Sequence, residues 1–105
     1  MPTILVVDDD PHIREVIDFA LQKAGFATVD AENGEQALAR FHATHPDLVV
    51  LDIVMPERDG TEVCRELRRV STVPIVFLSS RDDEVDRILG LELGGDDYVT
   101  KPFSP

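Results

Sequence analysis

The sequence predicts an α/β protein built on a five-stranded parallel sheet, and three observations support this prediction. Short apolar runs alternate along the chain with longer segments whose apolar residues recur at helical spacing. The runs at 4–7, 48–51 and 75–78 contain no polar residue, which is typical of strands buried on both faces of a parallel sheet. Carboxylate or hydroxyl side chains follow these runs directly, as they do where open α/β sheets bind ligands.

The first strand, at 4–7, leads into the most regular predicted helix. Asp10 is placed to cap this helix, and Pro11 opens it at the position where a missing backbone N–H costs least. Apolar residues then continue at helical spacing to Ala24, and Gly25 predicts the end of the helix.

The next strand differs in pattern from the buried ones. Residues 28–31 alternate polar with apolar, so we expect a half-exposed edge strand. Asn33 and Gly34 turn the chain into a second helix, which ends before Pro46. The buried strand that follows ends at Asp52.

The second half of the chain repeats the alternation. A turn marked by Pro56 and by Asp59-Gly60 precedes a helix at about 61–69, and the fourth strand ends at Ser79. A less regular helix is expected at about 82–93. A short fifth strand at 98–99 is followed by Lys101.

The strand ends together predict a chemical site. Parallel strands joined by right-handed crossovers end on one side of a sheet, which places the polar residues after them at one rim. Carboxylates gathered there repel one another and favour a bound cation, and oxygen ligands without His or Cys favour Mg²⁺ or Mn²⁺ over zinc. A carboxylate nucleophile, a hydroxyl and a lysine beside that cation suit phosphoryl transfer. The residues expected at this rim are Asp8, Asp9, Asp52, Ser79 and Lys101.

Composition limits the function classes. The 105 residues, 43% of them hydrophobic, suffice for one compact domain, expected to span 1–105. The net charge of -11 argues against direct nucleic-acid binding by this segment. No apolar run is long enough for a membrane span, no signal peptide pattern is present, and the lone Cys64 fits a partly buried helical thiol, so we expect a cytoplasmic protein.

Several of these residues have simpler explanations when taken singly. Asp52 alone would fit a helix cap or a solvated loop residue as well as it fits a ligand-binding site, and Asp10 is better explained as a cap than as a ligand. Tyr98 would fit an edge-strand aromatic that covers the core. The three histidines lack metal-ligand spacing and are expected at the surface. No glycine-rich phosphate loop or dinucleotide-binding motif is present, which removes those nucleotide-binding classes.

Nearly the whole chain resembles the receiver domains of two-component response regulators. The matching segments, in that family's order and spacing, are 6–9, 51–56 with 59–60, 77–80 and 97–103. The resemblance implies the flavodoxin-like receiver fold with strand order 2-1-3-4-5. The chain stops before the fifth helix of that fold, so we expect a C-terminally truncated domain that associates as a homodimer or by exchanging elements between protomers.

The resemblance also implies a role for each site residue. Asp52 would accept a phosphoryl group from a phosphohistidine of a sensor histidine kinase. Mg²⁺ would be bound by Asp9, Asp52 and the backbone carbonyl of Val54, with Asp8 acting through water. Lys101 would contact the phosphoryl group. The domain would then be a phosphoacceptor with weak self-phosphorylation and self-dephosphorylation chemistry rather than an enzyme.

A switch and a dimer surface follow from the same resemblance. Phosphorylation would draw Ser79 toward the phosphate and rotate Tyr98 inward, shifting the population between two conformers. Residues 86–98 are similar to the OmpR/PhoB-like regulators, which carry a winged-helix DNA-binding output domain. The surface that dimerises in that subfamily would include Arg87, Ile88, Leu91, Asp96 and Asp97.

Two other functions remain open at this point. The first is a receiver-like interaction module that no longer takes up phosphate, against which the full set of predicted site residues argues. The second is an aspartyl-phosphate phosphatase, which would need a second acid two residues after the nucleophile. Val54 stands at that position.

Overall fold

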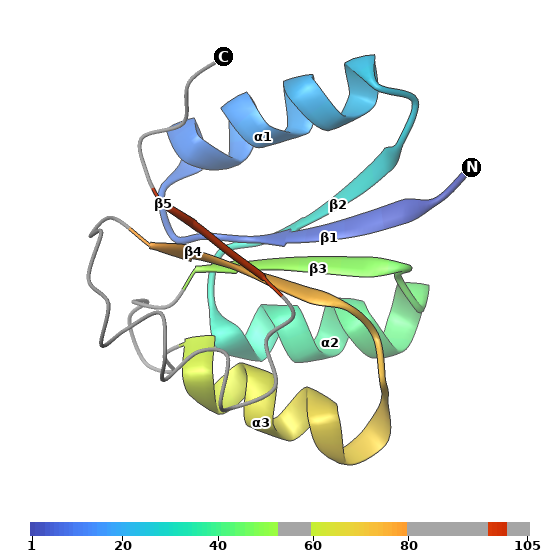
Figure 1. Ribbon diagram of the computed structural model, residues 1–105, viewed down its shortest axis with the longest axis vertical. Helices are drawn as coiled ribbons and strands as arrows, with labels where there is room; N and C mark the ends of the chain where they lie inside the picture. The colour runs from blue at the N-terminus through green and yellow to red at the C-terminus, as the bar shows by residue number, and fades with distance from the viewer. Residues whose placement is uncertain (53–59, 80–96, 101–105) are drawn as a thin grey trace.

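The computed structural model describes the backbone of residues 1–52, 60–79 and 97–100, and the side chains of residues 1–52 and 60–78. Its strands pair in parallel in the order β2-β1-β3-β4-β5 (Figure 1). The predicted order of the first four strands is confirmed, and β5 lies beside β4. The strands are β1 (Thr3–Val7), β2 (Ala27–Ala31), β3 (Leu48–Asp52), β4 (Ile75–Ser79) and β5 (Asp97–Thr100).

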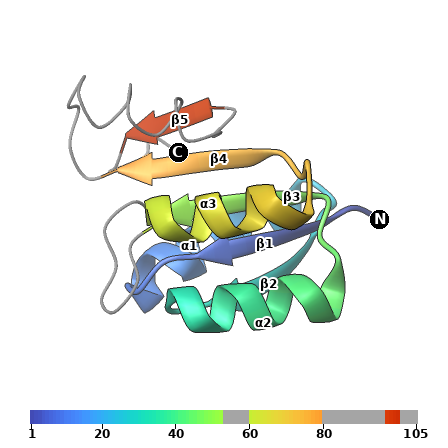
Figure 2. The same ribbon diagram turned by 90° about the horizontal axis from the view of Figure 1, so that it is seen from below.

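Helices cover both faces of the sheet. α1 (Pro11–Lys23) lies on one face, whereas α2 (Gly34–Thr44) and α3 (Gly60–Val70) lie side by side on the other (Figures 1 and 2). The helix predicted at 82–93 falls outside the described residues.

The helix ends form where the sequence predicts them. The Asp10 carboxylate accepts a hydrogen bond from the backbone N–H of His12 at 2.9 Å, so Asp10 caps α1. Gly25, just after α1, has a φ of 99°, a conformation that side chains disfavour. Asn33 caps α2 through a 2.8 Å hydrogen bond from the backbone N–H of Gln36. Local hydrogen bonds and backbone conformation therefore fix where α1 begins and ends and where α2 begins.

The two sheet faces carry separate apolar clusters. Leu5, Leu51 and Phe77 are fully buried on the face covered by α2 and α3. The cluster on the α1 face is smaller and includes Ile4 and Val6 from β1. Because successive strand residues point to opposite faces, an unbroken apolar strand supplies both clusters.

α1 packs less completely than its sequence pattern indicates. The helix has no fully buried residue, and Val16 and Phe19 are 44% and 69% exposed. Its contact with the sheet runs through a narrow stripe that includes Ile17 and Leu21. Helical spacing therefore locates α1 correctly but overstates the width of its packed face.

The exposure of the cysteine, the histidines and strand β2 can be compared with the sequence predictions. Cys64, the single cysteine of the chain, is fully buried in α3, which corrects the expectation of a partly buried thiol. All three histidines are exposed, as predicted. β2 has four half-buried residues and lies at the sheet edge, which confirms the edge-strand prediction. In the described part of the chain, no helix is long and apolar enough to cross a membrane.

Truncating a central strand residue tests this packing. Leu5 is fully buried in the larger cluster, so Leu5→Ala removes packed methyl groups and leaves a cavity. We expect the free energy of unfolding, measured by urea denaturation, to fall by about 2–5 kcal/mol. Val70→Ala, at a side chain 63% exposed, is the matched control, with an expected change below about 0.5 kcal/mol. Equal effects of the two substitutions would contradict the assigned core.

Candidate functional site: a carboxylate group at the sheet edge

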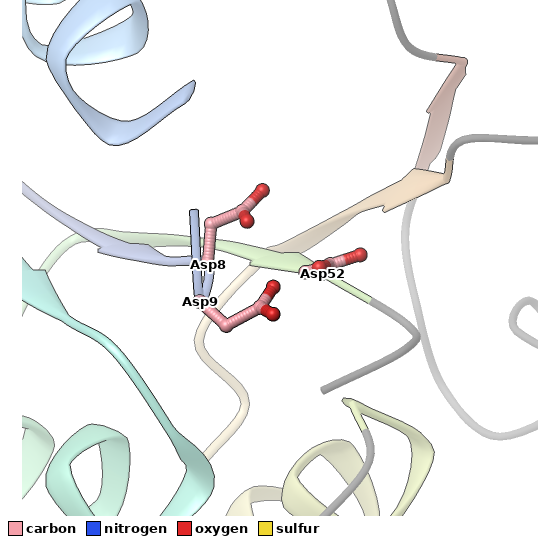
Figure 3. A group of neighbouring side chains, drawn as sticks. All are labelled: Asp8, Asp9 and Asp52. Atoms are coloured by element: carbon pink, nitrogen blue, oxygen red, sulfur yellow. The ribbon is translucent and has the colours of Figure 1, made fainter. Parts of the chain in front are cut away.

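Strand register brings aspartates from two distant segments together. Val7 at the end of β1 is paired with Leu51 in β3, so the residues that follow each of them are neighbours at the same edge. Asp8 and Asp9 come directly after β1, and Asp52 is the last residue of β3. Figure 3 shows the three side chains gathered at these strand ends.

The three carboxylates are close enough to share one ion. One oxygen of each lies within 4.8 Å of the oxygens of the other two. Asp8 is fully buried and Asp52 is 4% exposed, whereas Asp9 is exposed. Two carboxylates of the group therefore lie inside the protein, and the third faces solvent. An ion can enter the group from that solvent-exposed side.

Hydrogen bonds from backbone N–H groups hold the loop that carries Asp8 and Asp9. The Asp8 N–H donates to the carbonyl of Ala31 at 3.1 Å, which continues the pairing of β1 with β2. The Asp8 carboxylate accepts from the Asp10 N–H at 3.0 Å, and Asp10 caps α1. One short segment thus joins the sheet, the carboxylate group and the start of the helix.

Arg14 supports the same loop and is a residue that the sequence analysis missed. Its guanidinium donates from Nη1 to the backbone carbonyl of Asp8 at 2.6 Å and lies 3.7 Å from the Asp30 carboxylate. Arg14 stands one helical turn after Asp10, whose carbonyl accepts its backbone N–H. A basic residue one turn into the helix after an acidic strand end is the sequence signal that points to it.

The donor set fits a hard divalent cation. All three side chains offer carboxylate oxygen, and neither His nor Cys belongs to the group found among the described residues. Mg²⁺ and Mn²⁺ prefer such oxygen ligands, whereas structural zinc sites use thiolate or imidazole. Repulsion between the three negative charges would be relieved by a bound cation.

For some of the other predicted site residues the structure describes only the backbone, and the remaining ones lie outside the described residues. Asp52 is paired with Leu78, so Ser79 follows on the adjacent strand at the same edge. Tyr98 of β5 is paired with Phe77, and Asp97 begins β5. The predicted residues outside the described part of the chain are Val54, Lys101, Arg87, Ile88, Leu91 and Asp96.

Comparisons with known proteins agree with this geometry. Residues 4–105 match the model of the response regulator receiver domain family. The chain is 54% identical over 102 residues to the "Probable transcriptional regulator ycf27" of Cyanophora paradoxa, covering 97% of this chain and 43% of that protein. It is 52% identical to the ycf27 protein of Guillardia theta, covering 97% of this chain and 40% of that one. The chain therefore spans less than half the length of these relatives.

Solved structures show the same architecture. The BeF3-activated N-terminal receiver domain of Klebsiella pneumoniae RstA superimposes with a TM-score of 0.93 at 39% identity, covering 98% of this chain and 88% of that one. The response regulator protein TrrA of Thermotoga maritima, in complex with Mg(2+)-BeF, gives a TM-score of 0.89 at 40% identity, covering 99% and 90% of the two chains. With its acidic group in place, this chain belongs to the receiver domain family of two-component response regulators.

Proposed function

We propose that Asp52 accepts a phosphoryl group from the phosphohistidine of a sensor histidine kinase, with Mg²⁺ or Mn²⁺ bound beside it. The observation that carries the proposal is the group of three carboxylates at the ends of β1 and β3, in a chain that belongs to the receiver family. The cation would be held by Asp9, Asp52 and the backbone carbonyl of Val54, with Asp8 acting through water. The choice of Mg²⁺ is supported by the response regulator TrrA, which was solved in complex with Mg(2+)-BeF.

The positions of the three aspartates favour different roles. Asp52 ends a central strand and is almost fully buried, so its carboxylate is fixed by the sheet and poorly hydrated. The Asp8 carboxylate already accepts the Asp10 N–H, which favours a positioning role. Asp9 is exposed and can meet an ion arriving from solvent.

The proposed transfer needs one nucleophile and one leaving group. An Asp52 carboxylate oxygen attacks phosphorus, the phosphorus–nitrogen bond to the histidine breaks, and an acyl phosphate forms while the imidazole nitrogen takes the bonding electrons. The bound cation supplies positive charge that neutralises the transferring phosphoryl oxygens. We assign Lys101 a second positive charge beside that group.

The response to phosphorylation is part of the same proposal. Ser79 would hydrogen-bond the new phosphoryl group, and Tyr98 would turn inward on β5, moving the population toward an active conformer. Ser79 ends β4, the strand next to that of Asp52, and Tyr98 lies on β5, the next strand beyond it, which supports the assignment.

The output of the signal lies beyond this domain. The ycf27 relatives carry the name of transcriptional regulators and are more than twice as long as the matched segment. We propose that the domain acts in the cytoplasm and controls a DNA-binding output domain rather than binding DNA itself. Phosphorylation would favour a homodimer, or an element-exchanged oligomer, through Arg87, Ile88, Leu91, Asp96 and Asp97.

The phosphoryl transfer can be tested with a small donor. Incubation with acetyl phosphate and Mg²⁺ is expected to add one phosphoryl group per chain in the intact mass, because the small donor replaces the kinase. EDTA and the Asp52→Asn substitution should each abolish the adduct. Asp47→Asn is the matched control, since this exposed aspartate precedes the opposite end of β3, and it should be modified like the wild type.

Two outcomes would argue against the proposal. An adduct that persists in Asp52→Asn would place the chemistry elsewhere. A folded wild-type chain that binds Mn²⁺ but takes no phosphoryl group would favour the phosphate-independent interaction module.

Metal binding can be measured without any phosphoryl donor. Asp9→Asn replaces a charged ligand by a neutral one, so we expect the Mn²⁺ affinity to fall by at least about tenfold. Isothermal titration calorimetry measures this affinity directly, with Asp47→Asn again as the control. An unchanged affinity in Asp9→Asn would remove Asp9 from the ligand set.

A further inference from the structure

A second carboxyl pair lies away from the site, between α1 and the edge strand. Asp18 on α1 and Asp30 on β2 are within hydrogen-bonding reach of each other. The Oδ1 atom of each is shielded from solvent and, among the described residues, has no hydrogen-bond donor. A carboxylate oxygen only accepts hydrogen bonds, so two facing carboxylates satisfy each other only when one of them carries a proton.

The charged and polar groups around this pair leave it short of positive charge. From α1, Arg14 lies 3.7 Å from Asp30, but the same guanidinium also donates to the carbonyl of Asp8. From β2, the hydroxyl of Thr28 hydrogen-bonds Asp18 and accepts from Gln22 at 2.8 Å. One guanidinium therefore faces two carboxyl groups.

The far side of Asp30 does not supply the missing charge. A cavity of about 270 Å³ beside Asp30 is lined by Arg14 and by the two α2 side chains Gln36 and Arg40, and also by Glu32, a third acid. Arg40 donates from Nε to the backbone carbonyl of Asp30 at 3.2 Å. Because that hydrogen bond is made to the main chain, it satisfies neither carboxyl group of the pair.

The surroundings favour the protonated form of Asp18. Burial, followed by the hydrogen bond and the negative charge of Asp30, raises the pKa of Asp18 from 3.8 to about 7, against the opposing effects of Thr28 and Arg14. A proton would therefore be bound and released close to neutral pH.

We propose that Asp18 and Asp30 share one proton taken from solvent, and that this proton fastens α1 to the edge strand β2. With the proton bound, one carboxyl donates to the other across the contact between helix and strand. When the proton leaves, the two carboxylates repel each other and compete for the guanidinium of Arg14. Because Arg14 also holds the Asp8 carbonyl, the pair is connected to the loop that carries Asp9. The inference does not depend on the proposed phosphorylation.

The sign of the pH effect follows from proton binding. Asp18 has a higher pKa in the folded chain than in the unfolded one, so between about pH 4 and pH 7 the folded state holds more protons. The stability contributed by the pair is therefore complete at low pH and is lost as the pH rises through about 7. Around pH 5–6, the folding equilibrium constant should fall by up to about tenfold per pH unit through this group.

The direct test is a carboxyl titration of the wild-type chain. Carbon-detected NMR of the side-chain carboxyl of Asp18 is expected to show a midpoint near pH 7. A midpoint at the ordinary value near 3.8 would overturn the proposal. This measurement needs no variant and so remains decisive even if a substituted chain fails to fold.

Urea denaturation from pH 5 to pH 8 gives the second readout. Asp18→Asn replaces the shared proton by an amide donor that does not titrate, so its urea midpoint should vary less with pH and exceed that of the wild type at pH 8. Glu15→Gln, at an exposed carboxylate of the same helix, should keep the wild-type pH dependence. The same pH dependence in Asp18→Asn and the wild type would overturn the proposal.

Discussion

The parallel pairing of β1 with β3 at the centre of the sheet determines where the helices pack and where the carboxylate group lies. The two strands are apolar on both faces, so they are stable only at the centre of a sheet with helices on each side. Their register then brings the next residues, Asp8 and Asp52, to one edge. The carboxylate group is thus held together by the apolar burial of the strands that end at it, and not by any attraction between its members.

Holding three carboxylates close together costs free energy, but it also gathers oxygen ligands for a cation. Two like charges about 4 Å apart repel by roughly 1 kcal/mol in water and by roughly 4 kcal/mol at the lower effective dielectric of a protein surface. A folded domain has only about 5–15 kcal/mol of net stability, so a second and third carboxylate are a substantial load. The cation proposed above would remove that load, and its binding would then be coupled to the stability of the sheet edge. Arg14 supports the same loop in another way, since its guanidinium donates to the Asp8 carbonyl and lies 3.7 Å from the Asp30 carboxylate.

The sequence predicts best what depends on local chemistry and burial pattern. The apolar strands, the edge position of β2 and the cap at Asp10 are all confirmed, because each follows from a short segment read alone. The convergence of Asp8, Asp9 and Asp52 was also predictable, since parallel strands share an edge. The narrow contact of α1 was not, because it depends on how the helix is rotated on the sheet. The pairing of Asp18 with Asp30 depends on the same rotation, and nothing in the spacing of the two residues indicates it.

We propose that Asp52, among three adjacent carboxylates, is the one that receives the phosphoryl group. Borohydride reduces an acyl phosphate to the alcohol, so it converts a phosphorylated aspartate into homoserine and marks the residue permanently. Peptide mass spectrometry of the chain, after acetyl phosphate, Mg²⁺ and borohydride, is expected to find homoserine at position 52. Homoserine at position 8 or 9 instead, or at no position in a chain that carries a phosphoryl adduct, would contradict the account.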